Sequence, residues 1–116
     1  MVTINKVDSF EKLDEVFARS YGSPVVLFKH SNRCGISSHV FEMVRDIDGE
    51  LNVVVIQENR DLSDAISTRT GYTHQSPQAF VLVDGKPVYH ATHYGIDPSR
   101  IEDVVQLHQK VAPAGA

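Results

Sequence analysis

Two apolar runs separated by a helical pattern restrict the fold of this chain more than any other feature. Residues 25–28 and 51–56 are almost continuously apolar and rich in valine, which is typical of strands buried on both faces of a parallel sheet. Between them, apolar residues over 34–48 recur at helical spacing. Because a strand–helix–strand crossover is right-handed, residues 25–30 and 51–57 are predicted to lie parallel within one sheet.

The remaining segments extend this unit on both sides. A helix is predicted to begin after Asp8, where Glu11 is placed for a capping box, and to end near Tyr21. A short helix over 61–70 follows the second strand, and Asp84-Gly85 is typical of a hairpin turn. The predicted order is helix, strand, helix, strand, helix, two hairpin strands and a last helix from Pro98. This α/β order predicts a thioredoxin-like fold: a four-stranded mixed sheet flanked by helices, with an extra N-terminal helix.

Composition narrows the class of protein. The 116 residues suit a single domain over 1–116, with a frayed tail expected at 113–116. A net charge of −4 argues against nucleic-acid binding, and no apolar run is long enough to cross a membrane. Residues 1–20 are amphipathic and acidic, so we expect no secretory signal and a cytoplasmic location.

The single cysteine, Cys34, is the strongest candidate for chemistry. It follows the first buried strand and a short polar loop, and it opens the predicted helix. Unpaired backbone N–H groups and the helix dipole stabilise a thiolate there, and Arg33 is adjacent. This setting favours a reactive thiol over an inert buried cysteine. Ser37 stands where a dithiol protein would carry a second cysteine; it either donates a hydrogen bond to the thiolate or satisfies backbone groups of the first turn.

Three segments together resemble the YtxJ family of monothiol bacilliredoxins, over roughly residues 5–110. They are Phe28 to Ser37, Ser76-Pro77-Gln78 and Gly85 to His90. The resemblance implies a thiol–disulfide oxidoreductase that removes bacillithiol from mixed disulfides on client proteins, with bacillithiol as co-substrate and Cys34 as nucleophile. It also implies that the Ser76–Pro77 bond is cis and faces Cys34, although a proline before a strand also has a purely structural explanation.

The resemblance suggests where bacillithiol would bind. Its malate group requires cationic donors, and the candidates are Arg33, Lys29, Arg69 and His74, each of which could instead be an ordinary solvated side chain. Arg33 is the best of them because it adjoins the nucleophile. Gly35, Ser76 and Pro77 complete the expected binding site, and Gly35 departs from the proline that the family often has at this position.

Two other functions remain open. The Cys-Gly-Ile-Ser sequence at 34–37 is similar to the Cys-Gly-Phe-Ser of monothiol glutaredoxins, which suggests an iron–sulfur cluster carrier, although the glutathione-binding pattern is poorly met. A non-catalytic adaptor that binds partners through the face around Pro77 is the second alternative. Six histidines lack the spacing of a metal site, and no metal is expected.

Overall fold

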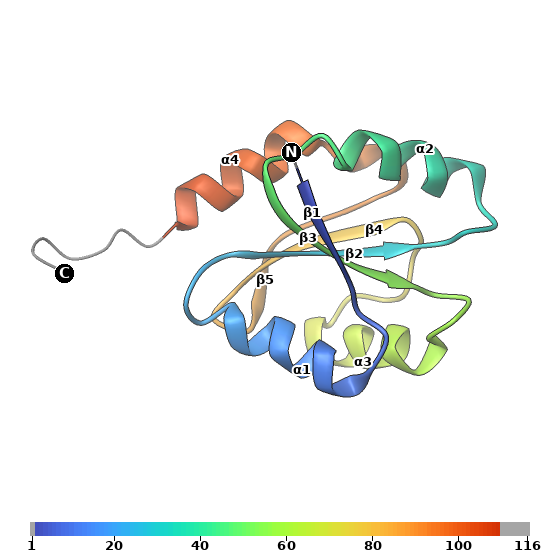
Figure 1. Ribbon diagram of the computed structural model, residues 1–116, viewed down its shortest axis with the longest axis horizontal. Coiled ribbons are helices and arrows are strands. Elements are labelled where there is room, and N and C mark those ends of the chain that lie inside the picture. The colour runs from blue at the N-terminus through green and yellow to red at the C-terminus, as the bar shows by residue number, and fades with distance from the viewer. Residues whose placement is uncertain (1, 110–116) are drawn as a thin grey trace, which may run out of the picture.

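A five-stranded mixed sheet forms the centre of the protein, whose computed structural model describes residues 2–109 (Figure 1). Its spatial order is β1-β3-β2-β4-β5. Helices α1 and α3 cover one face and α2 and α4 cover the other (Figure 1). The strands are β1 (Val2–Lys6), β2 (Val25–His30), β3 (Gly49–Val55), β4 (Gln78–Val83) and β5 (Lys86–Thr92). The helices are α1 (Phe10–Arg19), α2 (Gly35–Val44), α3 (Arg60–Thr70) and α4 (Pro98–His108), with the short 3-10 helix η1 (His93–Gly95) before α4.

Strand β2 is buried on both faces, as its apolar run predicts. Leu27 packs into the hydrophobic cluster beneath α1 and α3, whereas Phe28 packs into the cluster beneath α2 and α4. Both side chains are fully buried. Successive residues of a strand point to opposite faces, so a continuous apolar run can serve two core layers at once.

The pairing of β2 determines which strand ends lie together at one end of the sheet. It lies parallel to β3, with His30 opposite Val55, which confirms the predicted crossover. It lies antiparallel to β4, with Lys29 opposite Gln78. The ends of β2 and β3 and the beginning of β4 therefore meet at the same edge, and Cys34 follows β2 there.

The prediction of four strands is wrong, because the sheet gains β1 as a fifth. This strand pairs parallel with β3, from Val2 opposite Gly49 to Lys6 opposite Val53. The extension before β2 is consequently a strand followed by α1, not an extra helix alone. At this sheet edge the β1 side chains are exposed or only half-buried, so the strand lacks the apolar signal of β2 and β3.

Local boundaries differ in two places. Ser9, not Asp8, caps α1, because its Oγ accepts the Lys12 N–H at 3.1 Å, so the predicted capping box is wrong. Helix α2 ends at Val44, four residues earlier than predicted.

The predicted hairpin turn is confirmed by the positive φ angles of Asp84 and Gly85. The expected frayed tail at 113–116 lies outside the described residues. Within 2–109, no helix is long and apolar enough to cross a membrane.

Candidate active site

Cys34 lies at the beginning of α2, as the sequence predicts. It is the N-cap residue, with extended backbone angles (φ −112°, ψ 120°), and its carbonyl oxygen accepts the Ser38 N–H at 3.0 Å. The thiol is free and half-buried. Its side chain makes no capping hydrogen bond. The sulfur therefore lies at the N-terminus of α2, where unpaired backbone N–H groups favour a negative charge.

The loop that precedes Cys34 is held through all three of its backbone N–H groups, an arrangement we call the loop clamp. Ser31 N–H donates to Ser37 Oγ at 2.9 Å, and Arg33 N–H donates to Ser31 Oγ at 3.4 Å. Gln57, just beyond β3, accepts the Asn32 N–H at 3.1 Å and donates through Nε2 to Ser31 Oγ at 2.7 Å. The position of the nucleophile is thus fixed by side chains from α2 and from the end of β3.

Ser37 is fully buried, and its hydroxyl group contacts other residues inside the protein. Besides accepting from Ser31, its oxygen lies 2.8 Å from Nδ1 of His30. Burial lowers the pKa of His30, which keeps the imidazole neutral near pH 7. With its proton on Nε2, His30 accepts the Ser37 hydroxyl hydrogen. Ser37 does contact the backbone, but it accepts from Ser31 in the preceding loop and not from the first turn of α2, where the sequence placed this contact.

The proline loop lies next to the loop clamp. The Ser76–Pro77 bond is cis, as the resemblance implied. Extending the β2–β4 register one residue beyond the Lys29–Gln78 pair places Pro77 opposite His30, at the end of the strand that leads to Cys34. Pro77 is buried and Ser76 is half-buried. The carbonyl oxygen of Pro77 accepts the His93 N–H at 3.0 Å, which ties this loop to η1.

Lys29 is fully buried on the face of the sheet covered by α3. Its Nζ donates to the carbonyl oxygen of Ser63 at 3.5 Å. In the described part of the chain no carboxylate forms an ion pair with Lys29, and the attraction of Asp64 offsets only part of the desolvation. Burial lowers the pKa of Lys29 to about 8. Lys29 is therefore a buried charge rather than a side chain of an open binding site.

His74 is exposed and, like Lys29, contacts Ser63 of α3. Its Nδ1 lies 3.0 Å from Ser63 Oγ. Desolvation and the charge of Lys29 both lower the pKa of His74, so the imidazole is neutral at physiological pH. His74 can therefore donate or accept a hydrogen bond, but it does not supply the positive charge that the sequence interpretation assigned to it.

The other predicted binding residues are divided between two places. Arg33 is exposed and adjoins Cys34. Arg69 lies against α1, where it pairs with Asp14 at 2.8 Å and its guanidinium lies over the Phe17 ring. Gly35 has open space around the position that a Cβ would occupy, so no close approach requires glycine there. In residues 2–109, no cluster of three or more His, Cys, Asp or Glu side chains could hold a metal ion.

Sequence reasoning missed Gln57. The contacts of Gln57 with the loop are separated by more than twenty residues of chain, so no local pattern reports them. The available signal was the position of Gln57 directly after the second apolar run, since parallel strands end at the same edge of a sheet.

Comparison with known families now identifies the group to which the chain belongs. A family model described as monothiol bacilliredoxin BrxC matches residues 5–101. The chain belongs to this family. The family and fold together make it a thiol–disulfide oxidoreductase, and they confirm the family predicted from the sequence.

Solved structures agree with this fold. One, described as a candidate oxidoreductase with a thioredoxin fold, is 30% identical, with a TM-score of 0.78 over 86% of this chain and 91% of that chain. Thioredoxin from Nicotiana alata is 14% identical, with a TM-score of 0.70 over 92% and 93% of the two chains. A thioredoxin mutant from Halobacterium salinarum is 18% identical, with a TM-score of 0.66 over 95% and 94%. The two thioredoxins show the shared fold alone.

Replacing Gln57 by Met should loosen the loop clamp. The substitution removes the acceptor of the Asn32 N–H and the donor to Ser31 Oγ, so we expect the Asn32 amide to exchange its hydrogen about tenfold faster, equivalent to one hydrogen bond of about 1.4 kcal/mol. Hydrogen exchange followed by NMR measures this. Gln106→Met, at an exposed glutamine of α4, is the matched control. Unchanged protection of Asn32 in the Gln57 variant would show that the clamp does not hold the loop.

Replacing Lys29 by Met should stabilise the protein at neutral pH. The unfolded lysine has its ordinary pKa of 10.5 and the folded one a pKa of about 8, so the cost of burying the charge is complete below pH 8 and disappears as the pH approaches 10.5. We expect the free energy of unfolding to rise by about 3 kcal/mol at pH 7. The gain should be smaller at pH 10.

Urea unfolding of wild type and variant at both pH values measures this difference. Lys86→Met, at an exposed lysine, is the control and should change stability little at either pH. An equal gain for Lys29→Met at pH 7 and pH 10 would contradict the assignment of a depressed lysine pKa.

Proposed function

We propose that the protein removes bacillithiol from mixed disulfides on client proteins, with Cys34 as the only thiol nucleophile. The observation that carries this proposal is the lone free cysteine at the beginning of α2, followed at the fourth position of the motif by a buried serine. Membership of the monothiol bacilliredoxin family supports bacillithiol as the thiol involved. The single cysteine also fits a reducing compartment, and we assign the protein to the cytoplasm.

The chemistry proceeds by two thiol–disulfide exchanges. The Cys34 thiolate attacks the bacillithiol sulfur of the mixed disulfide, the bond to the client sulfur breaks, and the client leaves as a thiolate that takes a proton from water. Cys34 is then joined to bacillithiol. A second bacillithiol thiolate attacks that adduct at the bacillithiol sulfur, which releases Cys34 and forms bacillithiol disulfide. The net result is that the client cysteine is reduced and one free bacillithiol is consumed, because the bacillithiol removed from the client and the incoming one end together as bacillithiol disulfide.

Ser37 supports the monothiol form of this mechanism. A hydroxyl cannot form a disulfide, so Ser37 cannot release the adduct as a second cysteine would. Its contacts with Ser31 and His30 instead keep the first turn of α2 and the preceding loop together. We infer that the role of Ser37 is to position the nucleophile.

We assign recognition of bacillithiol to the groups around Cys34, of which Arg33 and Gly35 are exposed. Arg33 would pair with a malate carboxylate, and the N-terminal N–H groups of α2 would add to the positive potential. The space that a Cβ of Gly35 would occupy is open, so the thiol ligand could approach this residue closely. Ser76 and Pro77 would contact the remainder of the thiol, and His74 would contribute a neutral hydrogen bond.

The arginine beside the nucleophile should govern selectivity for the anionic thiol. With reduced protein and bacillithiol disulfide, intact-mass kinetics should show one adduct on the wild type and none on Cys34→Ser. Arg33→Gln should slow adduct formation about three- to tenfold, the loss expected for one charge-assisted contact at an exposed site. It should leave the reaction with the neutral hydroxyethyl disulfide unchanged.

Arg45→Gln is the matched control, because Arg45 is an exposed arginine at the other end of α2. It should react at the wild-type rate with both disulfides. An adduct on Cys34→Ser would contradict the assigned nucleophile. Equal slowing of both disulfides in Arg33→Gln, or wild-type behaviour with bacillithiol disulfide, would contradict the role of Arg33.

A further inference from the structure

The proline loop, residues 73–77, is held by the side chain of the residue that follows it. Gln78, the first residue of β4, is fully buried. Its Nε2 donates to the carbonyl oxygen of Thr73 at 3.1 Å, and its Oε1 accepts the Gln75 N–H at 3.4 Å. One carboxamide therefore closes the proline loop from the inside, as Gln57 does in the loop clamp.

The two backbone contacts fix which way the carboxamide of Gln78 points. If the amide were turned over, Oε1 would face the Thr73 carbonyl oxygen and Nε2 would face the Gln75 N–H, so both contacts would be repulsive. In the orientation that the loop requires, Nε2 lies 2.9 Å from Nε2 of His90 and directs its second N–H there. A hydrogen bond between two nitrogens needs one acceptor, so His90 is neutral and carries its proton on Nδ1.

The surroundings of His90 on β5 favour its neutral ring. His90 is half-buried and lies opposite Phe80, and its ring stacks on Tyr72 with the ring centroids 3.7 Å apart. Lys29 of β2 is the charged group that acts on His90 among the described residues. Burial and, secondly, that charge lower the pKa of His90 below its ordinary value of 6.5. The ring is consequently neutral at pH 7 and takes up a proton only at lower pH.

The other charged groups near this network act on its neighbours and not on His90 itself. Asp64 and Arg60 of α3 act on His74, and Asp64 also attracts Lys29. His74 titrates as well, but its Nδ1 contacts a serine hydroxyl of α3. A test of His90 must therefore separate the two histidines.

We propose that Gln78 is a positioning residue for the exchange with bacillithiol, and that protonation of His90 releases the proline loop from it. A proton on Nε2 of His90 places two donors 2.9 Å apart. The carboxamide then either turns over, which sets it against both of its backbone partners, or loses its anchor on β5. Either change weakens the hold on Ser76 and Pro77. The proposal rests on the proposed function in that it takes these two residues to contact the thiol.

Nitrogen-15 NMR of the reduced full chain tests the contact directly. The pH is lowered from 7.5 through the midpoint of the His90 ring, which is followed by its carbon-bound hydrogens. The Gln78 side-chain amide and the Gln75 backbone amide should shift with that same midpoint, because both depend on the orientation of one carboxamide.

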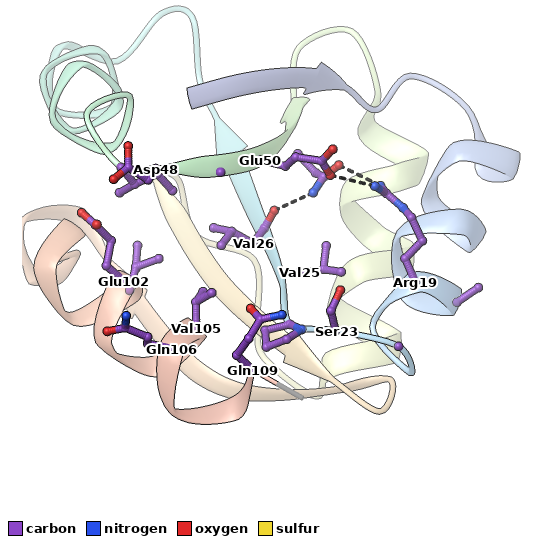
Figure 2. A pocket seen from close by; sticks show the side chains of 17 residues that line it. Arg19, Ser23, Val25, Val26, Asp48, Glu50, Glu102, Val105, Gln106 and Gln109 are labelled. Atoms are coloured by element: carbon purple, nitrogen blue, oxygen red, sulfur yellow. Dashed lines mark hydrogen bonds and ion pairs between the residues drawn. The ribbon is translucent and has the colours of Figure 1, made fainter. Parts of the chain in front are cut away.

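A second buried carboxamide is the matched control. Asn52 lines the cleft between α1 and α4, near the beginnings of β2 and β3 (Figure 2). It donates to the Val26 carbonyl oxygen and accepts from the Arg19 guanidinium, each at 3.0 Å. Because neither partner titrates in this range, the Asn52 side-chain amide should keep its chemical shift.

Two substitutions of His90 separate the hydrogen bond from its titration. His90→Gln keeps an acceptor at the position of Nε2 but takes up no proton, so Gln78 and Gln75 should lose their pH-dependent shifts. His90→Phe keeps a ring to stack on Tyr72 but removes the acceptor, so the loop should be loose at every pH. His108→Gln, at the end of α4, is the control for loss of a histidine elsewhere and should behave like wild type.

The rate of Cys34 adduct formation shows whether the loop position matters for exchange. The rate with bacillithiol disulfide is divided by the rate with hydroxyethyl disulfide, because the thiolate fraction of Cys34 cancels in this ratio. Relative to His90→Gln, the wild-type ratio should fall about three- to tenfold between pH 7.5 and one unit below the His90 midpoint, as expected for one hydrogen bond. His90→Phe and Gln78→Met should have the low ratio already at pH 7.5.

A Gln78 side-chain amide that stays constant while His90 titrates would overturn the proposal. So would shifts that persist in His90→Gln, since they would belong to His74. A wild-type ratio at pH 7.5 in Gln78→Met would show that Gln78 does not position the loop for exchange. Failure of the proposed function looks different: wild type would then form no bacillithiol adduct at any pH, whereas the NMR titration would still decide whether His90 controls Gln78.

Discussion

The pairing of β2 with a parallel strand on one side and an antiparallel strand on the other is the constraint on which the rest of the structure depends. Parallel pairing places the end of β3 beside the end of β2, and antiparallel pairing places the beginning of β4 there too. Cys34, Gln57 and Pro77 come from distant parts of the sequence, and this arrangement gathers them at one edge. The apolar run of β2 keeps the arrangement in place because it is buried on both faces.

Around that edge, the polar side chains hold the loop that carries the nucleophile in one position. Gln57 and Ser37 hold successive N–H groups of the loop, and the stacking of His30 on Phe41 supports Ser37 from behind. A reacting sulfur must meet a disulfide in line, so a loop held in one conformation favours the exchange. Lys29, in contrast, lowers the stability of the fold. It places an ammonium group in the core, where no carboxylate among residues 2–109 forms an ion pair with it.

The sequence predicted those features that depend on local patterns. The buried strands, the placement of Cys34 at a helix start and the Asp84-Gly85 turn follow from periodicity and turn chemistry. The β1 strand was not predicted, because an edge strand with mostly exposed side chains lacks a clear apolar pattern. The loop contacts of Gln57, the burial of Lys29 and the pairing of Arg69 with α1 depend on long-range packing. Residue type made Lys29 and Arg69 candidates alongside Arg33, which the sequence preferred only because it adjoins Cys34. The fold shows that Lys29 is buried and that Arg69 pairs with Asp14 of α1.

The central claim is that Cys34 accepts bacillithiol and cannot release it without a second thiol. It is tested most directly by one turnover of the reduced protein with a peptide whose cysteine is joined to bacillithiol, in the absence of free bacillithiol. Intact-mass analysis should show the protein heavier by one bacillithiol and the peptide with a free thiol. A disulfide between protein and peptide as the main product, or a reduced peptide beside unmodified protein, would contradict the account.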